Sequence, residues 1–371
     1  MTRAIVVGCG LLGASVAHRL AAAGIAVTIV EADRPAGGTS GASFAWVNAQ
    51  DKAPADYAAL NEAGVAAWPA LAAELGGDWL HPGGDLVVGI GPGAAAVEER
   101  LTRHEARGYP VRRLDRTEIA ALEPDLVLPA DGDLVAGHFP DEAWVDVHGV
   151  VGRLVRAARA NGARVVLADG VAGLIVERGR ATGVRLASGE AVDADLVVVA
   201  AGPATEMLLA GVGAQLPMAP TPGLLVVSGP IAGRVDRVVH AGGVAIRPDG
   251  GGRIMLSSRS VDASLDPATT GVPVDAEPAR DLLERAARLL PELAVAGLER
   301  ARIGRRSVAV DGLPAVGFVP GVEGLYVVVS HSGVTLAPVL GRLVAADLTG
   351  GSAAELEPYR PGRFAGAAIP A

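Results

Sequence analysis

The sequence predicts an α/β fold that combines a parallel-sheet unit with a region of antiparallel hairpins. Two observations carry this prediction. The chain opens with an apolar run at 3–7, a helical pattern at 11–23 and a second apolar run at 26–30, the order of a strand–helix–strand unit. From residue 173 onwards, short apolar runs are separated by glycine-containing turns, which is typical of hairpins. With 371 residues, of which 50% are hydrophobic, the chain can bury a large core in one or two domains.

The remaining elements follow from apolar spacing and from turn residues. Apolar residues at spacings of three and four predict helices at 57–75, 97–107, 116–122, 150–161, 278–290 and 336–348. Continuous or alternating apolar runs predict strands at 86–90, 164–167, 173–177, 181–186, 196–201 and 325–329. A further hairpin region is expected at 223–258, with turns at 178–180, 188–189, 228–230 and 249–252 in this half of the chain.

Composition and charge exclude several classes of protein. A net charge of −9 argues against a nucleic-acid partner, because phosphates are neutralised by a basic face. A single cysteine, Cys9, forms neither an internal disulfide nor a thiolate metal site, and we expect no metal. The first residues run directly into the first strand with no signal-peptide pattern, so a cytoplasmic location is expected. The longest uncharged stretch, 207–233, contains four prolines and is interpreted as a loop and a buried strand, not a membrane span.

A glycine-rich turn joins the first strand to the first helix, with the sequence Gly8-Cys9-Gly10-Leu11-Leu12-Gly13. The first glycine permits the tight turn, the second lets the backbone approach a pyrophosphate, and the third permits close helix packing. Glu31 ends the next strand, 18 residues after Gly13, where its carboxylate would accept hydrogen bonds from ribose hydroxyls. We therefore predict dinucleotide binding. Glu31 suits NAD and FAD equally, and Cys9 is interpreted as a small packing residue.

Further segments distinguish between the two dinucleotides. They are Gly37-Gly38-Thr39-Ser40-Gly41-Ala42-Ser43, Val171, the run 196–203, the segment 311–317 and Ser330-His331-Ser332-Gly333-Val334-Thr335 followed by 336–338. In this order and spacing the sequence resembles the D-amino-acid oxidase superfamily of FAD enzymes, closest to its glycine oxidase and sarcosine oxidase branch. The resemblance extends over nearly the whole chain and is weaker between about 205 and 300.

The resemblance implies a Rossmann-like FAD-binding domain of discontinuous segments and an α+β substrate-binding domain with a mixed β-sheet. The expected FAD-binding segments are 1–80, 146–225 and 301–371, and the substrate-binding segments are 81–145 and 226–300. The expected FAD-contacting residues are Gly8, Gly10, Leu11, Leu12, Gly13, Glu31, Ala32, Thr39, Ser40, Ala42, Ser43, Val171, Ala201, Gly202, Ser332, Gly333, Val334 and Thr335. Some relatives attach the flavin through a cysteine near the C-terminus or a histidine after the second strand. Neither is present here, so non-covalent FAD is expected.

The implied activity is oxidation of a small amino acid or secondary amine, such as glycine, sarcosine, an N-substituted glycine or a D-amino acid. A hydride would pass from the substrate Cα to flavin N5, the resulting imine would hydrolyse, and O2 would be reduced to H2O2. Two alternatives stay open: a dehydrogenase of an amino or 2-hydroxy acid that uses a quinone or another carrier, and a nucleotide-binding protein without turnover. The oligomeric state is not predicted.

Three side chains are the catalytic candidates. Arg306 occupies the position at which the resemblance implies a carboxylate-binding arginine, although Arg302 and Arg305 are adjacent alternatives and a solvated basic strand edge is another. His331 occupies the loop position that would overhang the flavin, where the resemblance implies another cation; it would bind substrate, assist deprotonation of the amine, or merely bond backbone. Lys52, the only lysine among 32 basic residues, follows the FAD loop and would supply positive charge for the oxygen reaction if it is not simply solvated. Trp46, Asn48, His240 and Arg247 are further candidates to face the ligand.

Overall fold

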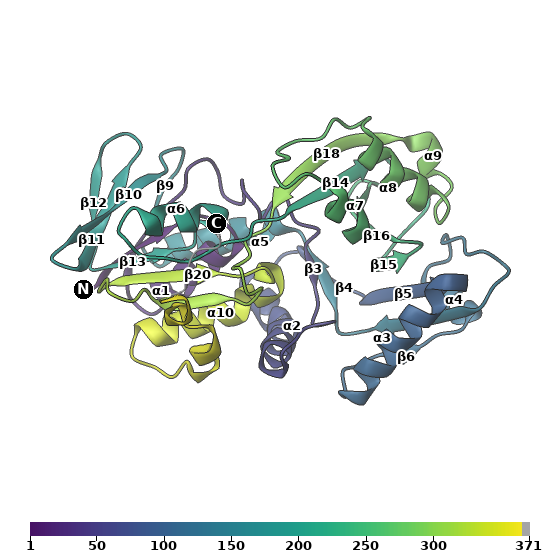
Figure 1. The fold of residues 1–371 in the computed structure, drawn as a ribbon, viewed down its shortest axis with the longest axis horizontal. Helices are drawn as coiled ribbons and strands as arrows, with labels where there is room; N and C mark the ends of the chain where they lie inside the picture. The colour runs from purple at the N-terminus through teal and green to yellow at the C-terminus, as the bar shows by residue number, and fades with distance from the viewer. Residues whose placement is uncertain (366–371) are drawn as a thin grey trace.

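The computed structural model describes residues 1–365, which form a six-stranded and an eight-stranded sheet besides smaller ones. The two large sheets lie toward opposite ends of the molecule (Figure 1). The first sheet has the order β19-β20-β13-β1-β2-β9. Its strands are β1 (Arg3–Val7), β2 (Ala26–Val30), β9 (Arg164–Val166), β13 (Leu196–Val199), β19 (Ala315–Phe318) and β20 (Leu325–Val329). All pairings are parallel except that of β19 with β20. Distant parts of the sequence therefore complete one sheet, as the predicted discontinuous domain requires.

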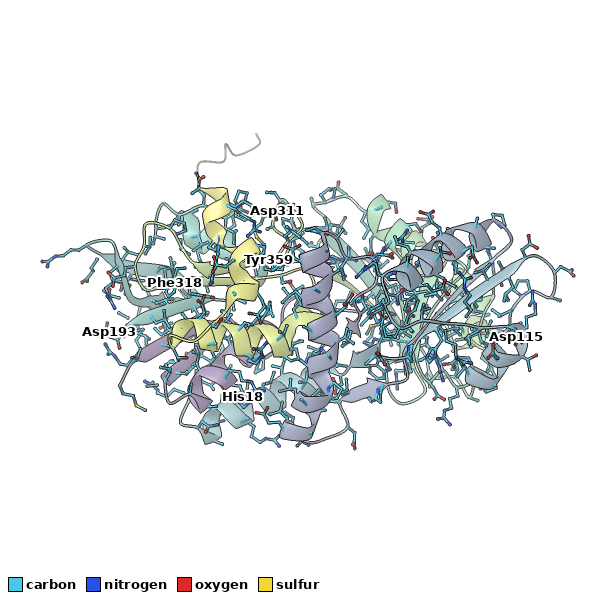
Figure 2. All side chains as sticks on the ribbon, turned by 90° about the horizontal axis from the view of Figure 1, so that it is seen from below. His18, Asp115, Asp193, Asp311, Phe318 and Tyr359 are labelled. Atoms are coloured by element: carbon cyan, nitrogen blue, oxygen red, sulfur yellow. The ribbon has the colours of Figure 1, made fainter. Side chains whose placement is uncertain are left out.

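Helices cover one face of this sheet and bury its apolar side chains. They are α1 (Leu11–Ala22), α2 (Ala55–Leu75), α5 (Val147–Ala160) and α10 (Gly333–Leu348). Figure 2 shows α2 crossing the middle of the molecule against α10. Gly64 permits this contact, because a Cβ there would lie 2.7 Å from the carbonyl oxygen of Thr335. The other face packs against β10 (Val171–Glu177), β11 (Arg180–Leu186), β12 (Ala191–Asp193) and α6 (Thr205–Ala210).

The eight-stranded sheet has the order β18-β14-β17-β16-β15-β5-β7-β6. Its strands are β5 (Asp85–Ile90), β6 (Arg112–Arg113), β7 (Leu134–Phe139), β14 (Pro222–Ser228), β15 (Val238–Ala241), β16 (Val244–Pro248), β17 (Ile254–Ser257) and β18 (Leu298–Arg305). The sheet is mixed because β15 runs parallel to β5 while the other neighbours are antiparallel. The associated helices are α3 (Ala94–Ala106), α4 (Arg116–Leu122), α7 (Arg259–Ser264), α8 (Glu277–Ala287) and α9 (Leu293–Ala296). A small sheet of β3 (Trp46–Val47), β8 (Ala143–Val145) and β4 (Leu80–Pro82) adjoins the two larger ones.

The predicted α/β fold class is confirmed, and the hairpin turns at 178–180 and 249–252 are present. The predicted hairpin turn at 228–230 is wrong. β14 pairs with β17 and β18, and the chain leaves it through a loop to reach β15, whose neighbour is β5. The hairpin in this region turns instead at Gly242-Gly243, between β15 and β16. Apolar spacing in the sequence cannot show which strands pair, because the residues of β5 that pair with β15 lie 153 positions earlier in the chain.

Two of the expected domain limits fall inside strands. Both β14 and β18 belong wholly to the eight-stranded sheet, so this sheet extends across the limits expected at 225/226 and 300/301. The division itself stays a prediction, and its last six residues lie outside the described part of the chain. The uncharged stretch at 207–233 forms the end of α6, a loop and the buried strand β14. Within residues 1–365, no helix combines the length and the apolar character that crossing a membrane requires.

Candidate active site

A cavity of about 1440 Å³ lies between the two large sheets. This exceeds the roughly 300–1,000 Å³ of ordinary small-molecule pockets and suits a dinucleotide together with a substrate. The carboxyl ends of β1, β2 and β20 open into it, the edge at which α/β sheets bind ligands. Of the FAD-contacting and catalytic candidates from the sequence, all except Gly13 line this cavity: Gly8, Gly10, Leu11, Leu12, Glu31, Ala32, Thr39, Ser40, Ala42, Ser43, Lys52, Val171, Ala201, Gly202, Arg306, His331, Ser332, Gly333, Val334 and Thr335.

The glycine turn before α1 leaves no room for side chains. Gly8 has φ +100°, and a Cβ there would lie 2.5 Å from the carbonyl oxygen of Ala200. A Cβ at Gly13 would overlap the carbonyl oxygen of Gly8, so Gly13 holds α1 against the turn without reaching the cavity. The hydroxyl of Ser40 accepts a hydrogen bond from the Leu11 N–H at 2.9 Å, which brings the segment after β2 alongside the start of α1.

Glu31 is fixed by the backbone at the far side of the same turn. Its carboxylate accepts hydrogen bonds from the N–H groups of Cys9 at 2.7 Å and Asp33 at 3.0 Å. The side chain therefore stands at the cavity wall in one orientation, next to Ala32 and Gly170. A carboxylate held in this way can receive the hydroxyl groups of a ribose.

Two helices present their N-termini to the cavity, α1 through Gly10–Leu12 and α10 through Ser332–Thr335. The N-cap residues Gly10 and Ser332 make no side-chain capping bond, so apart from the Leu11 N–H, which bonds Ser40, N–H groups of both first turns are available to a ligand. The residues fit FAD: the start of α1 would hold the pyrophosphate and the start of α10 would face the electron-rich end of the flavin ring. The helix α10 begins at Gly333, three residues earlier than the sequence pattern predicts.

The three neighbouring arginines have different partners. The Arg302 guanidinium donates to the carbonyl oxygens of Gly41 at 3.1 Å and Gly37 at 2.8 Å, which fastens the segment after β2 to β18. Arg305 donates to the carbonyl oxygen of Pro267 at 2.9 Å. All three residues are among those that line the cavity.

Arg306 alone among the three forms an ion pair. It bonds the buried carboxylate of Asp262 and donates to the carbonyl oxygen of Pro222 at 3.1 Å. Gly223 provides the space, because a Cβ there would lie 2.7 Å from Arg306 Nη2. Asp262 was missed by sequence reasoning, and no motif marks it, since 44 residues separate the pair.

His331 and Lys52 lie at the same part of the cavity, and both have perturbed pKa values. Loss of water around the imidazole, followed by the positive charges of Lys52, Arg306 and Arg259, lowers the pKa of His331 to about 4. The imidazole is therefore neutral near pH 7, whereas the resemblance implies a cation at this position. Desolvation and then the charge of Arg259 lower the pKa of Lys52 to about 8. Lys52 is thus a cavity residue and not a solvated loop lysine.

A buried polar network reaches the cavity through His240. The imidazole Nδ1 lies 2.8 Å from the buried carboxylate of Asp85, and Gln50 Nε2 donates to both Asp85 and Glu142 at 2.8 Å. Trp46 donates to Glu142 from its indole at 2.9 Å. Trp46, Asn48 and His240 line the cavity, whereas Arg247 does not. Arg247 is buried, donates to the carbonyl oxygen of Phe44 at 2.6 Å and stacks over the ring of Trp144.

Comparisons with known proteins place the chain in a family. The family model described as DAO, FAD dependent oxidoreductase, matches residues 3–347. A glycine oxidase from Geobacillus kaustophilus is 30% identical over 353 residues, covering 92% of this chain and 91% of that protein. The crystal structure of glycine oxidase from Geobacillus kaustophilus superposes with a TM-score of 0.86 at 27% identity and covers 98% and 99% of the two chains. An iminodiacetate oxidase from Chelativorans sp. BNC1 gives a TM-score of 0.81 at 27% identity over 97% and 99%.

The chain belongs to this DAO family, and it is an FAD-dependent oxidoreductase. The predicted family, fold and cofactor are confirmed. The roles of individual cavity residues stay predictions.

Proposed function

We propose that the protein oxidises the C–N bond of a small amino acid or secondary amine that carries a carboxylate, with O2 as the electron acceptor. The observation that carries this proposal is a cavity between two helix N-termini whose far wall holds Arg306. Glycine oxidase and iminodiacetate oxidase relatives support an amine substrate. When bound, FAD supplies the two-electron acceptor for the substrate Cα–H, and the imine product hydrolyses to the carbonyl compound.

The chain's own residues orient the substrate and control its protons. The guanidinium of Arg306 binds the substrate carboxylate with N–H groups that Asp262 and Pro222 leave free, since an arginine carries five. Asp262 fixes the plane of that guanidinium, because its other oxygen accepts the Leu224 N–H at 2.8 Å. His331, being neutral, can accept a hydrogen bond from the substrate amine without adding charge. Lys52 provides positive charge for the reduction of oxygen.

FAD is held without a covalent bond in this proposal. Cys9 is buried beneath the glycine turn, and the segment from Thr39 to Trp46 contains no histidine. Acid precipitation should therefore release the flavin into the supernatant.

The proposal is tested with a peroxide-coupled screen over glycine, sarcosine, N-substituted glycines, and D- and L-amino acids. Formation of H2O2 with at least one of them is expected. Anaerobic reduction of the flavin by substrate without rapid reoxidation in air would indicate a dehydrogenase instead. Protein that takes up no FAD would contradict both alternatives.

Replacing Arg306 tests the carboxylate clamp. Arg306→Gln should lower kcat/KM for carboxylate substrates by about 30-fold to 1,000-fold, because a charged hydrogen-bond pair is lost at a cost of roughly 2–4 kcal/mol. Arg305→Gln is the matched control, since this neighbour bonds the Pro267 carbonyl. If Arg305→Gln lowered kcat/KM as much as Arg306→Gln or more, the proposed carboxylate-binding role of Arg306 would be wrong.

A further inference from the structure

Positive charge is concentrated on the wall of the cavity. The whole chain has a net charge of −9, yet among residues 1–365 only two carboxylates, Glu31 and Asp262, line the cavity. The cationic lining residues are Lys52, Arg100, Arg259, Arg285, Arg288, Arg302, Arg305 and Arg306. A positively charged cavity in a protein with a negative net charge favours a ligand that carries several negative charges.

Most of these cations already have partners in the protein. Arg100 pairs with Asp51 at 3.1 Å and Arg285 pairs with Asp281 at 2.6 Å. Arg302 and Arg305 bond carbonyl oxygens, and Arg306 pairs with Asp262, as described above. The remaining three are Lys52, Arg259 and Arg288, which form no ion pair and no side-chain hydrogen bond among residues 1–365.

Two of the unpaired cations, Lys52 and Arg259, act together with Arg306 on His331. The charges of Lys52, Arg306 and Arg259 all act on the imidazole of His331, after its desolvation. Arg259 also acts on the ammonium of Lys52. The carboxyl groups of Glu142 and Asp51 also act on Lys52, but Asp51 is already paired with Arg100 and Arg103. Cations held close together repel each other, and a bound anion would relieve that repulsion.

The pyrophosphate of FAD does not account for this cluster. It would lie at the start of α1, where Leu11 and Ser40 bond each other. Arg259 begins α7, on the side of the eight-stranded sheet. The guanidinium of Arg285 ties α8 to the carbonyl oxygen of Gly243 at 3.2 Å and to the Ser260 hydroxyl at 2.9 Å, so the start of α7 is fixed on that wall. Arg259 therefore lies on the wall formed by the eight-stranded sheet, and Lys52 and Arg306 are the cations that act together with it.

We propose that the substrate carries a second carboxylate, which Lys52 and Arg259 bind while Arg306 binds the first. The substrate class is then an amine with two carboxylates, placed either on the nitrogen substituent, as in iminodiacetate, or on the side chain, as in aspartate. Arg288 also lines the cavity and adds to its positive potential. This inference rests on the proposed amine oxidation and specifies its substrate.

Equilibrium binding tests the second carboxylate without turnover. The FAD-loaded protein is titrated with propionate, malonate and succinate, and binding is followed by the change in the flavin absorption spectrum. At least one dicarboxylate should bind about 10-fold or more tightly than propionate, since a charged hydrogen bond contributes on this scale. Arg259→Gln should remove about 10-fold of the dicarboxylate affinity and change propionate binding less than about 3-fold. Equal affinities for the two classes, or an unaffected Arg259→Gln, would overturn the inference.

Arg342→Gln is the matched control for net charge. Arg342 lies on α10 with its side chain 61% exposed, outside the residues that line the cavity. Its substitution should leave both affinities unchanged. If it weakens dicarboxylate binding as much as Arg259→Gln does, general attraction and not a built site explains the preference, and the inference fails.

Turnover separates this inference from the proposed function. The rates of flavin reduction by sarcosine, iminodiacetate, D-aspartate and L-aspartate are compared under anaerobic conditions. A higher kcat/KM for iminodiacetate places the second carboxylate on the nitrogen substituent, and a higher value for an aspartate places it on the side chain. Better oxidation of sarcosine than of every dicarboxylate contradicts the inference and leaves amine oxidation standing. Tight binding of dicarboxylates without reduction by any amine contradicts the proposed function instead.

Discussion

The thiol of Cys9 sits between the two glycines of the turn before α1 and is fully buried. Burial, and then the nearby charge of Glu31, raises the pKa of this thiol to about 12. Because the thiolate is the reactive form, the native protein should resist thiol reagents at pH 8. We expect labelling by a disulfide reagent to be at least about 100-fold slower in the native protein than in urea. Rapid labelling of the native protein would contradict this, and Cys9→Ser, which has no thiol, gives the background in both states.

Individual site residues were predictable from the sequence where they occur in local motifs. Gly8, Gly10 and Glu31 are recognisable because the turn, the helix and the next strand follow one another within 31 residues. Asp262 and Arg259 are not, because only the folding of β14 beside α7 brings this short helix to Arg306. The pairing of His240 with Asp85 is hidden for the same reason, since the two residues are 155 positions apart in the sequence and meet only because β15 pairs with β5.

At the scale of elements, the packing of α1 on the glycine turn can be tested at Gly13. In Gly13→Ala the new Cβ overlaps the carbonyl oxygen of Gly8, so the helix must move away from the turn. Such overpacking costs about 1–3 kcal/mol, and we expect a lower melting temperature together with at least about 10-fold weaker FAD binding. Both are measured on apoprotein reconstituted with FAD.

The matched control lies in another helix of the same layer. Gly152 is in α5, and a Cβ there has no neighbour within 4 Å. Gly152→Ala should leave FAD affinity unchanged and stabilise the protein by about 0.5–1 kcal/mol, because alanine is the better helix former. Wild-type FAD affinity and stability in Gly13→Ala would show that α1 tolerates the shift.

The elements themselves were predicted best where periodicity is local. The expected strands at 3–7, 26–30 and 325–329 coincide with β1, β2 and β20, which are nearly continuous apolar runs, as expected for strands of a sheet that is covered on both faces. The eight-stranded sheet was predicted only in part. Its order depends on pairings between distant strands, such as β14 with β18, that no local pattern encodes.

At the scale of the whole molecule, Glu142 joins elements from several parts of the chain. It precedes β8, and its carboxylate accepts hydrogen bonds from Gln50, Tyr109 and Trp46 at 2.8 to 2.9 Å. Complete burial, and then the charge of Asp85, raises the pKa of Glu142 to about 8. The folded protein therefore holds a proton at neutral pH that an unfolded chain, with an ordinary glutamate, releases.

The sign of the resulting pH dependence is fixed by proton linkage. Between about pH 4.5 and pH 8 the native state binds more protons at this site than the unfolded state, so stability contributed by Glu142 falls as pH rises. Glu142→Gln removes this titration and keeps the hydrogen bonds that a protonated carboxyl group makes. The amide oxygen can accept from Trp46 and Gln50, and the amide nitrogen can donate to the Tyr109 oxygen. The variant should match the wild type near pH 5 and melt several degrees higher near pH 9.

Glu74 provides a control with the opposite sign. Partial burial opposes its ionisation, but hydrogen bonds from Arg19 and His18, which is labelled in Figure 2, keep its pKa below the usual value. The stability that the Glu74 carboxylate contributes is present at neutral pH and is lost as the pH falls. The melting temperature of Glu74→Gln should therefore lie below that of the wild type at pH 7 and approach it in acid. The melting temperatures of both variants and the wild type, measured from pH 4.5 to 9, test these two opposite pH dependences. A difference between Glu142→Gln and the wild type that does not grow with pH would mean that this carboxyl is already ionised in the native protein.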